Sequence, residues 1–541
     1  MSPNIKQKQI SKVQILLNNL KLDKANKEAL RLLDIDSNNI AILKLLVEIN
    51  VVFDDLDKQE KYILKLIKIE PTNPSFCNDL AGVYTKLHKY NIAKEMYLKA
   101  IEYSNGDSDM YANLANLYHK IKDYDKAEEL FNLAYANNDW QETSKISYSM
   151  FLLENKKYIL GFDLYRNRHL KNQSELLSQD KVLKKGTNIQ GKRIYLTSGQ
   201  GPGDMIIFMR YINIFEKMGA TVFIKPKKDL YRLFDANYPH IIIKDNHIDV
   251  DYHLPLIDAA YFFETEYDNI PYSEGFLTVK KDDSTVIYNK YFKGVSKKKI
   301  GIVWKSNPTK SETASRSRAR SYKSATLELF IKYFNTDEVQ LYSLQYAVCD
   351  EDRKILENNN IMSLGDEFED FYDNALVIDN LDSVITIETA SLILAGAMGK
   401  EAVGMVHYNA FWLWGRDDKH TNWFNSIRLA RKTSLDDWDS AFKNALKIEN
   451  LLSIPFNEIM QRAIQLHRIG DIKAAEELYR KILSVEPNNA DAYHYLGVIA
   501  SQTGNIEQAI ALINHSITLN PNLLEAKENL QKILMLSSEG M

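Results

Sequence analysis

The chain has 541 residues, of which 45% are hydrophobic and 26% charged, so it is too long for one hydrophobic core and suggests about three or four domains. Acids and bases nearly balance at a net charge of −4, so no strongly basic field favours nucleic acid or anionic membrane as a general partner, and only a local basic groove is left open. The opening MSPNIKQKQISKVQ has no apolar core, and no apolar run reaches the roughly 18 residues of a membrane span, so a cytoplasmic protein is expected.

The amino-terminal part of the chain contains a repeat. Five positions recur 34 residues further on: Leu80, Tyr84, Ala93, Tyr97 and Ala100 return as Leu114, Tyr118, Ala127, Phe131 and Ala134. The period and pattern resemble tetratricopeptide repeats, in which small alanines let paired helices approach and aromatic rings fill the space between hairpins. We therefore expect an all-α solenoid over residues 1–180, with its first helix starting near residue 8.

A second repeat block lies at the carboxyl end. Three positions recur 34 residues later, namely Gly470, Ala475 and Pro487 as Gly504, Ala509 and Pro521. Because two isolated repeats bury little apolar surface, this block, residues 452–541, is expected to pack on its neighbour or on a final helix in LLEAKENLQKILML.

Between the solenoids, short β-rich segments alternate with amphipathic helices. KRIYLTS, ATVFIKP and HIIIKD predict the strands of one α/β unit over 185–292, and KKIGIVWKS, VQLYSLQ, SVITIE and EAVGMVH predict those of a second over 297–448. Two successive sets of this kind predict two doubly wound, Rossmann-like domains that face one cleft, with a hinge in YFKGVSKKK, residues 291–299.

A glycine-rich loop follows the first predicted strand. In GQGPGD, Gly199, Gly201 and Gly203 let the backbone approach a ligand, and Asp204 stands at the start of the next helix. The order differs from the dinucleotide fingerprint G-x-G-x-x-G, and a tight turn with Asp204 as helix N-cap explains the spacing equally well.

Five segments from Tyr165 to Trp438 together resemble bacterial glycosyltransferases that carry tetratricopeptide repeats and are similar to the ADP-heptose:lipopolysaccharide heptosyltransferases. In chain order, the segments are GQGPGDMIIFMRYI, GIVWKSNP, LYSLQ, LGDEFEDFYDNALVIDNLDSVITIETASLILAGAMGK and WLWGRDDKHTNWFNSIRLAR. The resemblance covers about half the chain. It implies a GT-B fold and sugar transfer from a nucleotide-sugar donor, with the acceptor held by the first α/β unit and the donor by the second.

The resemblance assigns the catalytic base to Asp204. An acceptor hydroxyl is a poor nucleophile until a base takes its proton, and a positioned carboxylate supplies roughly two to four powers of ten in rate. The apolar helix that follows Asp204 is expected to raise the pKa of this carboxyl.

The resemblance places the donor diphosphate at a turn in TIETASLIL, where Thr389, Ala390 and Ser391 precede a helix whose N-terminus stabilises developing negative charge. Gln345 and Glu388 belong to the same expected donor site. The chain departs from the family at three positions: Glu388 replaces an aspartate, Ile393 a histidine and Tyr346 a lysine. These departures imply either an altered donor or a loss of catalysis.

Further donor contacts are expected after the strand IGIVW. Phosphate capture is expected from Lys305, Asn307, Lys310, Arg320 and Ser321, because arginine and lysine both bind phosphate oxygens. For the neighbouring Arg316 and Arg318, a solvated loop is the preferred interpretation. In WLWGRDDKHTNWF, Arg416 is a candidate donor contact, although aromatic residues at this density more often form a core or an interdomain contact.

No resident metal or cofactor is expected. Asp249 and Asp251 have the D-x-D spacing of metal-dependent glycosyltransferases, but the family resemblance favours metal-independent transfer. Cys77 and Cys349 lie too far apart in sequence for a disulfide framework or metal-ligand spacing.

The sequence therefore predicts a metal-independent, inverting glycosyltransferase whose substrate is a nucleotide sugar and whose repeats present the acceptor. Solenoids offer extended concave surfaces suited to peptides, so a protein acceptor, such as a flagellin or another surface protein, is expected, with a glycan or lipid-linked acceptor left open. The alternative is a protein-interaction scaffold whose transferase-like part no longer turns over.

Overall fold

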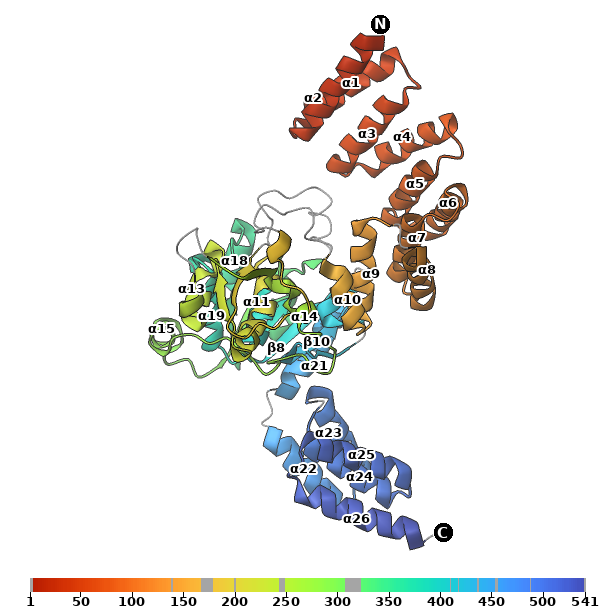
Figure 1. Ribbon diagram of the computed structural model, residues 1–541. Coiled ribbons are helices and arrows are strands. Elements are labelled where there is room, and N and C mark those ends of the chain that lie inside the picture. The colour runs from red at the N-terminus through yellow and green to blue at the C-terminus, as the bar shows by residue number, and fades with distance from the viewer. Residues whose placement is uncertain are drawn as a thin grey trace.

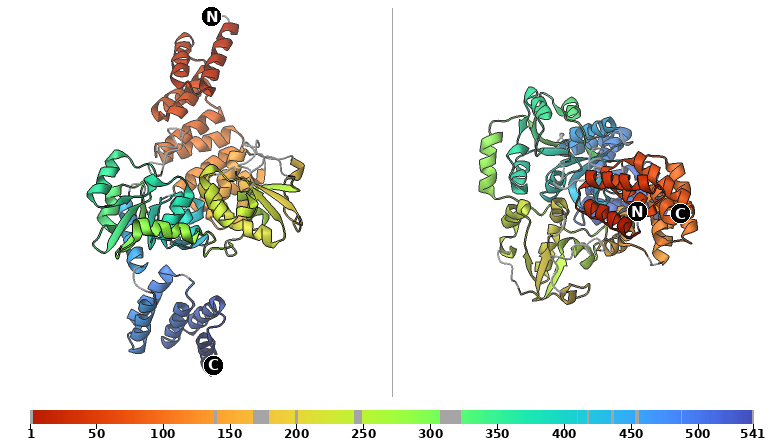
Figure 2. Two further views of the ribbon diagram at one scale, coloured as in Figure 1. Left: turned by 90° about the vertical axis from the view of Figure 1, so that its left-hand side faces the viewer. Right: turned by 90° about the horizontal axis from the view of Figure 1, so that it is seen from above.

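The structure is a computed structural model that describes residues 3–137, 140–166, 179–198, 201–242, 249–306, 323–408, 410–416, 418–434, 437–452, 456–486 and 488–539. The molecule is elongated (Figures 1 and 2), with a helical solenoid at each end and an α/β body between them. The amino terminus lies at one tip and the carboxyl terminus at the other.

The amino-terminal solenoid consists of antiparallel helix pairs. Its helices are α1 (Pro3–Asn18), α2 (Leu22–Ile35), α3 (Ile40–Phe53), α4 (Leu56–Ile69), α5 (Pro74–Lys86), α6 (Tyr90–Tyr103), α7 (Ser108–Lys120), α8 (Tyr124–Asn137), α9 (Glu142–Glu154) and α10 (Tyr158–Tyr165). Short polar side chains begin several of them: Asn39 caps α3 and Asp107 caps α7 by accepting backbone N–H bonds. The repeated alanines, among them Ala93 and Ala127, are fully buried, as close pairing of helices requires.

The carboxyl-terminal solenoid follows a connecting helix, α21 (Trp438–Leu452), and has cores of its own. It comprises α22 (Phe456–Arg468), α23 (Ile472–Val485), α24 (Ala490–Gln502), α25 (Ile506–Leu519) and α26 (Leu524–Glu539). The final helix α26 packs on α25 and α24, which confirms that the last repeat is covered by a helix in LLEAKENLQKILML.

The first α/β unit has a parallel sheet of three strands in the order β2-β1-β3. Its strands are β1 (Arg193–Thr197), β2 (Thr221–Ile224) and β3 (Tyr252–Pro255), and its helices are α11 (Pro202–Phe208), α12 (Ile212–Lys217), α13 (Tyr231–Asn237) and α14 (Ala259–Phe262). The prediction of a strand in HIIIKD is wrong for the residues that the structure describes. Pro239–Ile241 forms a 3-10 turn, and Ile242 makes only an isolated bridge to Ile224. Residues 243–245 of that motif lie outside the described residues.

The second α/β unit has seven strands in the order β6-β5-β4-β7-β8-β10-β9. The strands are β4 (Lys298–Val303), β5 (Val339–Ser343), β6 (Met362–Ser363), β7 (Ser383–Ile387), β8 (Ala402–Val406), β9 (His420–Thr421) and β10 (Phe424–Arg431). Its helices are α17 (Leu327–Phe334), α18 (Asp350–Asn358), α19 (Phe371–Asp379) and α20 (Ala390–Ala397). The parallel strands from β6 to β10 follow the doubly wound order 3-2-1-4-5-6, whose switch point lies between β4 and β7. The sequence did not predict β10, which pairs with β8.

The segment before β4 is attached to the second unit. Helix α15 (Lys281–Ile287) packs on α19, and Lys290 and Tyr291 both contact the Glu367 carboxylate. The first residue of the expected hinge at 291–299, Tyr291, is therefore already in contact with the second unit. The two units also meet through Arg232 on α13, which donates to both carboxylate oxygens of Asp370 at 2.7 and 2.8 Å.

Trp423, just before β10, joins three parts of the molecule. The ring is fully buried, and its Nε1 donates to the Tyr158 hydroxyl of α10 at 3.0 Å. Its backbone carbonyl accepts from Arg210 Nη2 of the first unit at 2.9 Å. The aromatic segment 411–423 thus forms the interdomain contact that its density predicts, with Phe162 and Trp412 edge-on to Trp423.

Arg210 follows α11 and is completely buried. Its guanidinium donates to the carbonyl oxygens of Ile207, Pro271 and Trp423. Burial lowers the pKa of Arg210 to about 9, so the group stays charged near neutral pH. A buried guanidinium is stable only when its N–H groups have acceptors, so the three carbonyl oxygens must stay in place around Arg210.

We predict that Tyr158→Phe destabilises the protein by about 1–3 kcal/mol, because it leaves the buried Trp423 N–H without its acceptor. Urea unfolding followed by tryptophan fluorescence measures the change. Tyr288→Phe is the control, because Tyr288 is 44% exposed. Equal stability of the two variants would contradict the role of this hydrogen bond.

Candidate functional site

A cavity of about 640 Å³ lies at the carboxyl ends of β4, β5 and β7. Val303, Leu344 and Thr389 line it from the ends of these three strands, and Asp229 lines it from the first α/β unit. This is the switch point of the doubly wound sheet, where open α/β sheets bind their ligands.

The cavity brings together five of the residues that the sequence assigned to a donor site. Lys305, Gln345, Thr389, Ala390 and Ser391 all line it. Residues 307–322, which include the expected contacts Asn307, Lys310, Arg320 and Ser321, lie outside the described residues, as does Gly199.

Lys305 is held by a short chain of polar contacts at the cavity wall. Its Nζ lies 2.5 Å from Asp352 Oδ2, which also accepts a bond from Trp304 Nε1 at 2.9 Å. Burial alone would raise the pKa of Asp352, but the bonds from Lys305 and Trp304 outweigh it and lower that pKa. The Lys305 charge is therefore already partly balanced by a carboxylate in this structure.

Asn374 on α19 is a lining residue that sequence reasoning missed. Its Nδ2 donates to Ser391 Oγ at 2.9 Å, whereas its Oδ1 is buried without a hydrogen-bond partner among the described residues. A buried unsatisfied acceptor costs about 1–3 kcal/mol, and a ligand N–H or O–H group would satisfy it. The signal was visible only as an asparagine directly before the apolar run ALVI in the segment FYDNALVID.

The expected base, Asp204, lies in the first turn of α11. Gly201 is the N-cap of this helix, so Asp204 is not the N-cap that the alternative interpretation required. Helix α11 packs on α20, and a Cβ atom added to Gly203 would lie 3.1 Å from Ile393 Cδ1 and 4.0 Å from Ala390 Cβ. Asp204 thus follows the residue at which α11 contacts the start of α20, and it does not itself line the cavity.

The three family departures occupy different environments. Glu388 turns away from the cavity lining: its carboxylate accepts the backbone N–H groups of His407 at 2.7 Å and Phe411 at 3.4 Å. Ile393 packs against Gly203 at the contact of α11 with α20. Tyr346 lines the cavity and is 57% exposed.

The structure does not bring Arg416 to the cavity. Its guanidinium contacts the Asn155 side chain and lies 3.5 Å from the ring centroid of Tyr124, both in the amino-terminal solenoid. The expected donor contact is thus replaced by a contact that holds the repeats on the body. The sequence could not show this, because Asn155 lies 261 residues before Arg416 in the chain.

The D-x-D aspartates take part in local structure. Asp251 Oδ2 accepts the backbone N–H of Arg193 at 2.8 Å beside the β1–β3 pair, and this hydrogen bond is the main reason that the pKa of Asp251 is lowered. Among the described residues, no group of three or more His, Cys, Asp or Glu could hold a metal ion. Within the same residues, no helix combines the length and apolarity needed to cross a membrane.

Comparison with known proteins identifies the repeats. The tetratricopeptide repeat family matches residues 74–107, 96–129 and 468–534, so the chain carries these repeats in both solenoids. Protein FlbA of Caulobacter vibrioides is 24% identical over 285 residues, which span 47% of this chain and 46% of that protein. The chain thus matches less than half the length of that relative.

Solved structures give weaker likenesses. PilF of Pseudomonas aeruginosa is 14% identical, with 43% of this chain and 92% of that chain covered and a TM-score of 0.29. A tetratricopeptide repeat protein of Thermus thermophilus is 14% identical, with 31% and 93% covered and a TM-score of 0.28. Likenesses at this level carry no argument about the body of the chain.

We predict that Asn374→Leu weakens binding of nucleoside diphosphates at least about fivefold and lowers the free energy of unfolding by about 1–3 kcal/mol. The variant removes a buried acceptor that has no partner among the described residues and that a ligand would use, and it also removes the bond from Asn374 Nδ2 to Ser391 Oγ, which costs the fold. Titration calorimetry with ADP, GDP and UDP, together with urea unfolding, measures both effects.

Asn380→Leu, at the C-cap of the same helix, is the matched control. Asn380 donates to Ser284 and to the Leu376 carbonyl, so its loss should destabilise the protein and leave nucleotide affinity unchanged. An Asn374→Leu protein that binds all three nucleotides as the parent does would contradict the assignment of this acceptor.

Proposed function

We propose that this chain is a GT-B glycosyltransferase that transfers a sugar from a nucleotide-sugar donor to an acceptor hydroxyl. The observation that carries the proposal is the cavity at the switch point of the second α/β unit, which the first unit helps to close. Five residues expected at the donor site from the family resemblance line this one cavity. Asp229 and the Arg232–Asp370 ion pair support a cleft that both units share.

The proposed chemistry is a single displacement with inversion. The acceptor oxygen attacks the anomeric carbon of the donor, the bond from that carbon to the diphosphate breaks, and Asp204 takes the proton of the acceptor hydroxyl. The nucleoside diphosphate leaves with the bonding electron pair. The N-terminus of α20, with Thr389 as N-cap and Ser391 in the first turn, would stabilise its negative charge.

A protein acceptor fits the repeats best. Tetratricopeptide repeats support a protein-interaction role, and the amino-terminal solenoid is packed directly on the body. A segment held along the solenoid would reach Asp204 as an intramolecular substrate, which raises its effective concentration. A small sugar acceptor would need no such surface.

The second candidate function is a scaffold whose transferase-like body binds but does not turn over a nucleotide sugar. Glu388 favours it, because this carboxylate is committed to backbone N–H groups rather than to the cavity. Thermal stabilisation by nucleotide sugars, without hydrolysis and without transfer to cell extract, would support the scaffold against the enzyme.

We predict that Asp204→Asn folds normally, binds the donor and transfers sugar at least about a hundredfold more slowly, because the amide cannot take the proton. Transfer of radiolabelled sugar to cell extract gives the rate. Asp235→Asn is the control, since the described contact of Asp235 is an ion pair with exposed Lys280 at 3.5 Å. If both variants transferred at the parent rate, Asp204 would not be the base.

We also predict that removal of residues 1–106 keeps slow donor hydrolysis but lowers modification of a protein acceptor at least about tenfold. The truncation ends before Asp107, the N-cap of α7, so it spares the helices that carry Tyr124 and Tyr158 and their contacts with the body. Remote binding energy that positions the acceptor is lost, whereas donor binding is not. Full-rate modification of the protein acceptor by the truncated protein would mean that residues 1–106 do not position it.

A further inference from the structure

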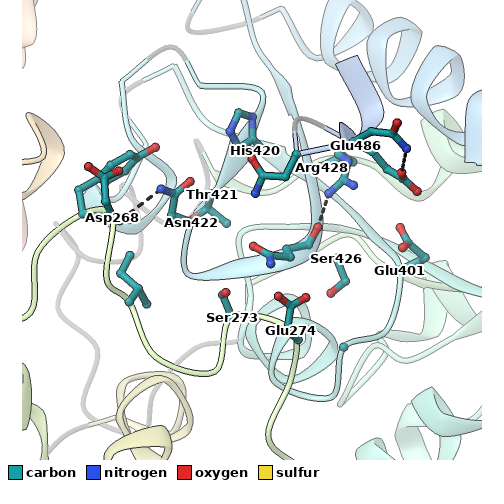
Figure 3. Close-up of a pocket in the computed structure, with 16 residues that line it drawn as sticks. Asp268, Ser273, Glu274, Glu401, His420, Thr421, Asn422, Ser426, Arg428 and Glu486 are labelled. Carbon is teal, nitrogen blue, oxygen red and sulfur yellow. Dashed lines mark hydrogen bonds between the residues drawn. The ribbon is translucent and has the colours of Figure 1, made fainter. Parts of the chain in front are cut away.

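A second cavity, of about 630 Å³, lies at the amino ends of β8 and β10, where three parts of the chain meet, whereas the proposed donor site lies at the carboxyl ends of β4, β5 and β7. Its lining comes from the first unit at 267–274, from the second unit at 399–428 and from the turn before α24 at 486–489 (Figure 3). None of the residues assigned to sugar transfer lines it.

Two side chains at the buried base of this cavity have unused hydrogen-bonding atoms. Ser426 and Arg428 lie two residues apart on the same face of β10, and are 8% and 5% exposed. Ser426 Oγ and Arg428 Nε have no hydrogen-bond partner among the described residues, although Arg428 Nη1 donates to the carbonyl oxygens of Asn425 and Ile427. Burial lowers the pKa of Arg428. Such a base would receive an acceptor oxygen, such as a peptide carbonyl.

The rim of the cavity is acidic. Asp268, Glu274, Glu401 and Glu486 line it, against the single guanidinium of Arg428. Burial lowers the pKa of His420, which keeps this ring neutral near pH 7. A concave surface with an excess of carboxylates attracts a cationic ligand.

The lining gives little support to a neutral sugar ring. One face of Tyr267 is already occupied, because Lys156 Nζ lies 4.4 Å from its ring centroid, and the ring of Tyr158 packs on it in a T-shaped contact. A peptide bearing lysine or arginine matches both features: its side-chain cation pairs with the rim and its backbone carbonyl accepts from the base.

We propose that this cavity is a second binding site, which takes a short lysine- or arginine-bearing polypeptide segment between the carboxyl-terminal repeats and the body. The cation lies against Glu274 and Glu401, and a backbone carbonyl of the segment accepts from Arg428 Nε. The site is separate from the cleft beside Asp204, so a partner can be held there whether or not sugar transfer occurs.

The test uses the full chain with no nucleotide sugar present. Fluorescently labelled, blocked pentapeptides Gly-Lys-Gly-Lys-Gly and Gly-Glu-Gly-Glu-Gly are titrated by anisotropy at low salt, with cellotetraose as an unlabelled competitor. We expect the lysine peptide alone to bind, and the double variant Glu274→Gln with Glu401→Gln to weaken it at least about fivefold. Glu338→Gln, an exposed carboxylate away from the cavity, should leave the affinity unchanged.

Carbodiimide coupling of the bound lysine peptide, followed by peptide mapping, locates the site. Amide bonds to Glu274, Glu401 or Glu486 support the proposal. It is overturned if the lysine peptide binds no better than the glutamate peptide, if the double variant binds as the parent does, if coupling occurs on carboxylates elsewhere, or if cellotetraose displaces the peptide. Because the assay needs no donor, its failure leaves the proposed sugar transfer untouched.

Discussion

The geometry of the body depends on the burial of Trp423 between three partners. Its indole N–H donates to Tyr158 of the amino-terminal repeats, and its carbonyl oxygen accepts from Arg210 of the first unit. Its backbone leads directly into β10 of the second unit. Neither of these two hydrogen bonds can be exchanged for one to water, because the indole and the guanidinium are both fully buried. One residue therefore fixes the solenoid, the first unit and the second unit relative to one another.

This joint sets the position of the proposed base. Arg210 follows α11 almost immediately, so its anchoring holds the helix that begins near Asp204 against α20. Backbone approach makes the interface tight: Gly399 adopts φ +68°, and a Cβ atom there would lie 2.5 Å from the Glu274 carbonyl oxygen. The cleft is thus built on closely packed backbone at one end and on the Arg232–Asp370 pair at the other. Any opening of the two units must break one of these contacts.

Local patterns in the sequence predicted most of the helices and strands but few of the contacts between the parts of the molecule. The 34-residue recurrence is a short-range property of helix pairs, and the strands KRIYLTS and KKIGIVWKS carry their apolar character within a few residues. The strand predicted in HIIIKD was wrong because an apolar run of this length fits a buried turn as well as a strand. The strand YHLP, which pairs with β1, was missed because it is too short and too polar to be recognised in the sequence. The role of Arg416 depends on Tyr124, and that of Asn374 on Ser391, so both required the tertiary structure.

The two solenoids are attached by different kinds of contact, and this difference bears on how each can act. Tyr158 and Phe162 belong to the same continuous hydrophobic core as Trp412 and Trp423, so the amino-terminal repeats keep one orientation toward the cleft. The carboxyl-terminal repeats have separate cores and meet the body through α21 and a cavity lined by polar and acidic side chains. Apolar burial resists reorientation, whereas a contact between polar and charged side chains reorganises at little cost and responds to salt. In the proposed function, the amino-terminal solenoid therefore guides a bound chain along a fixed path, and at the proposed second site the carboxyl-terminal solenoid changes its contacts when a charged partner enters.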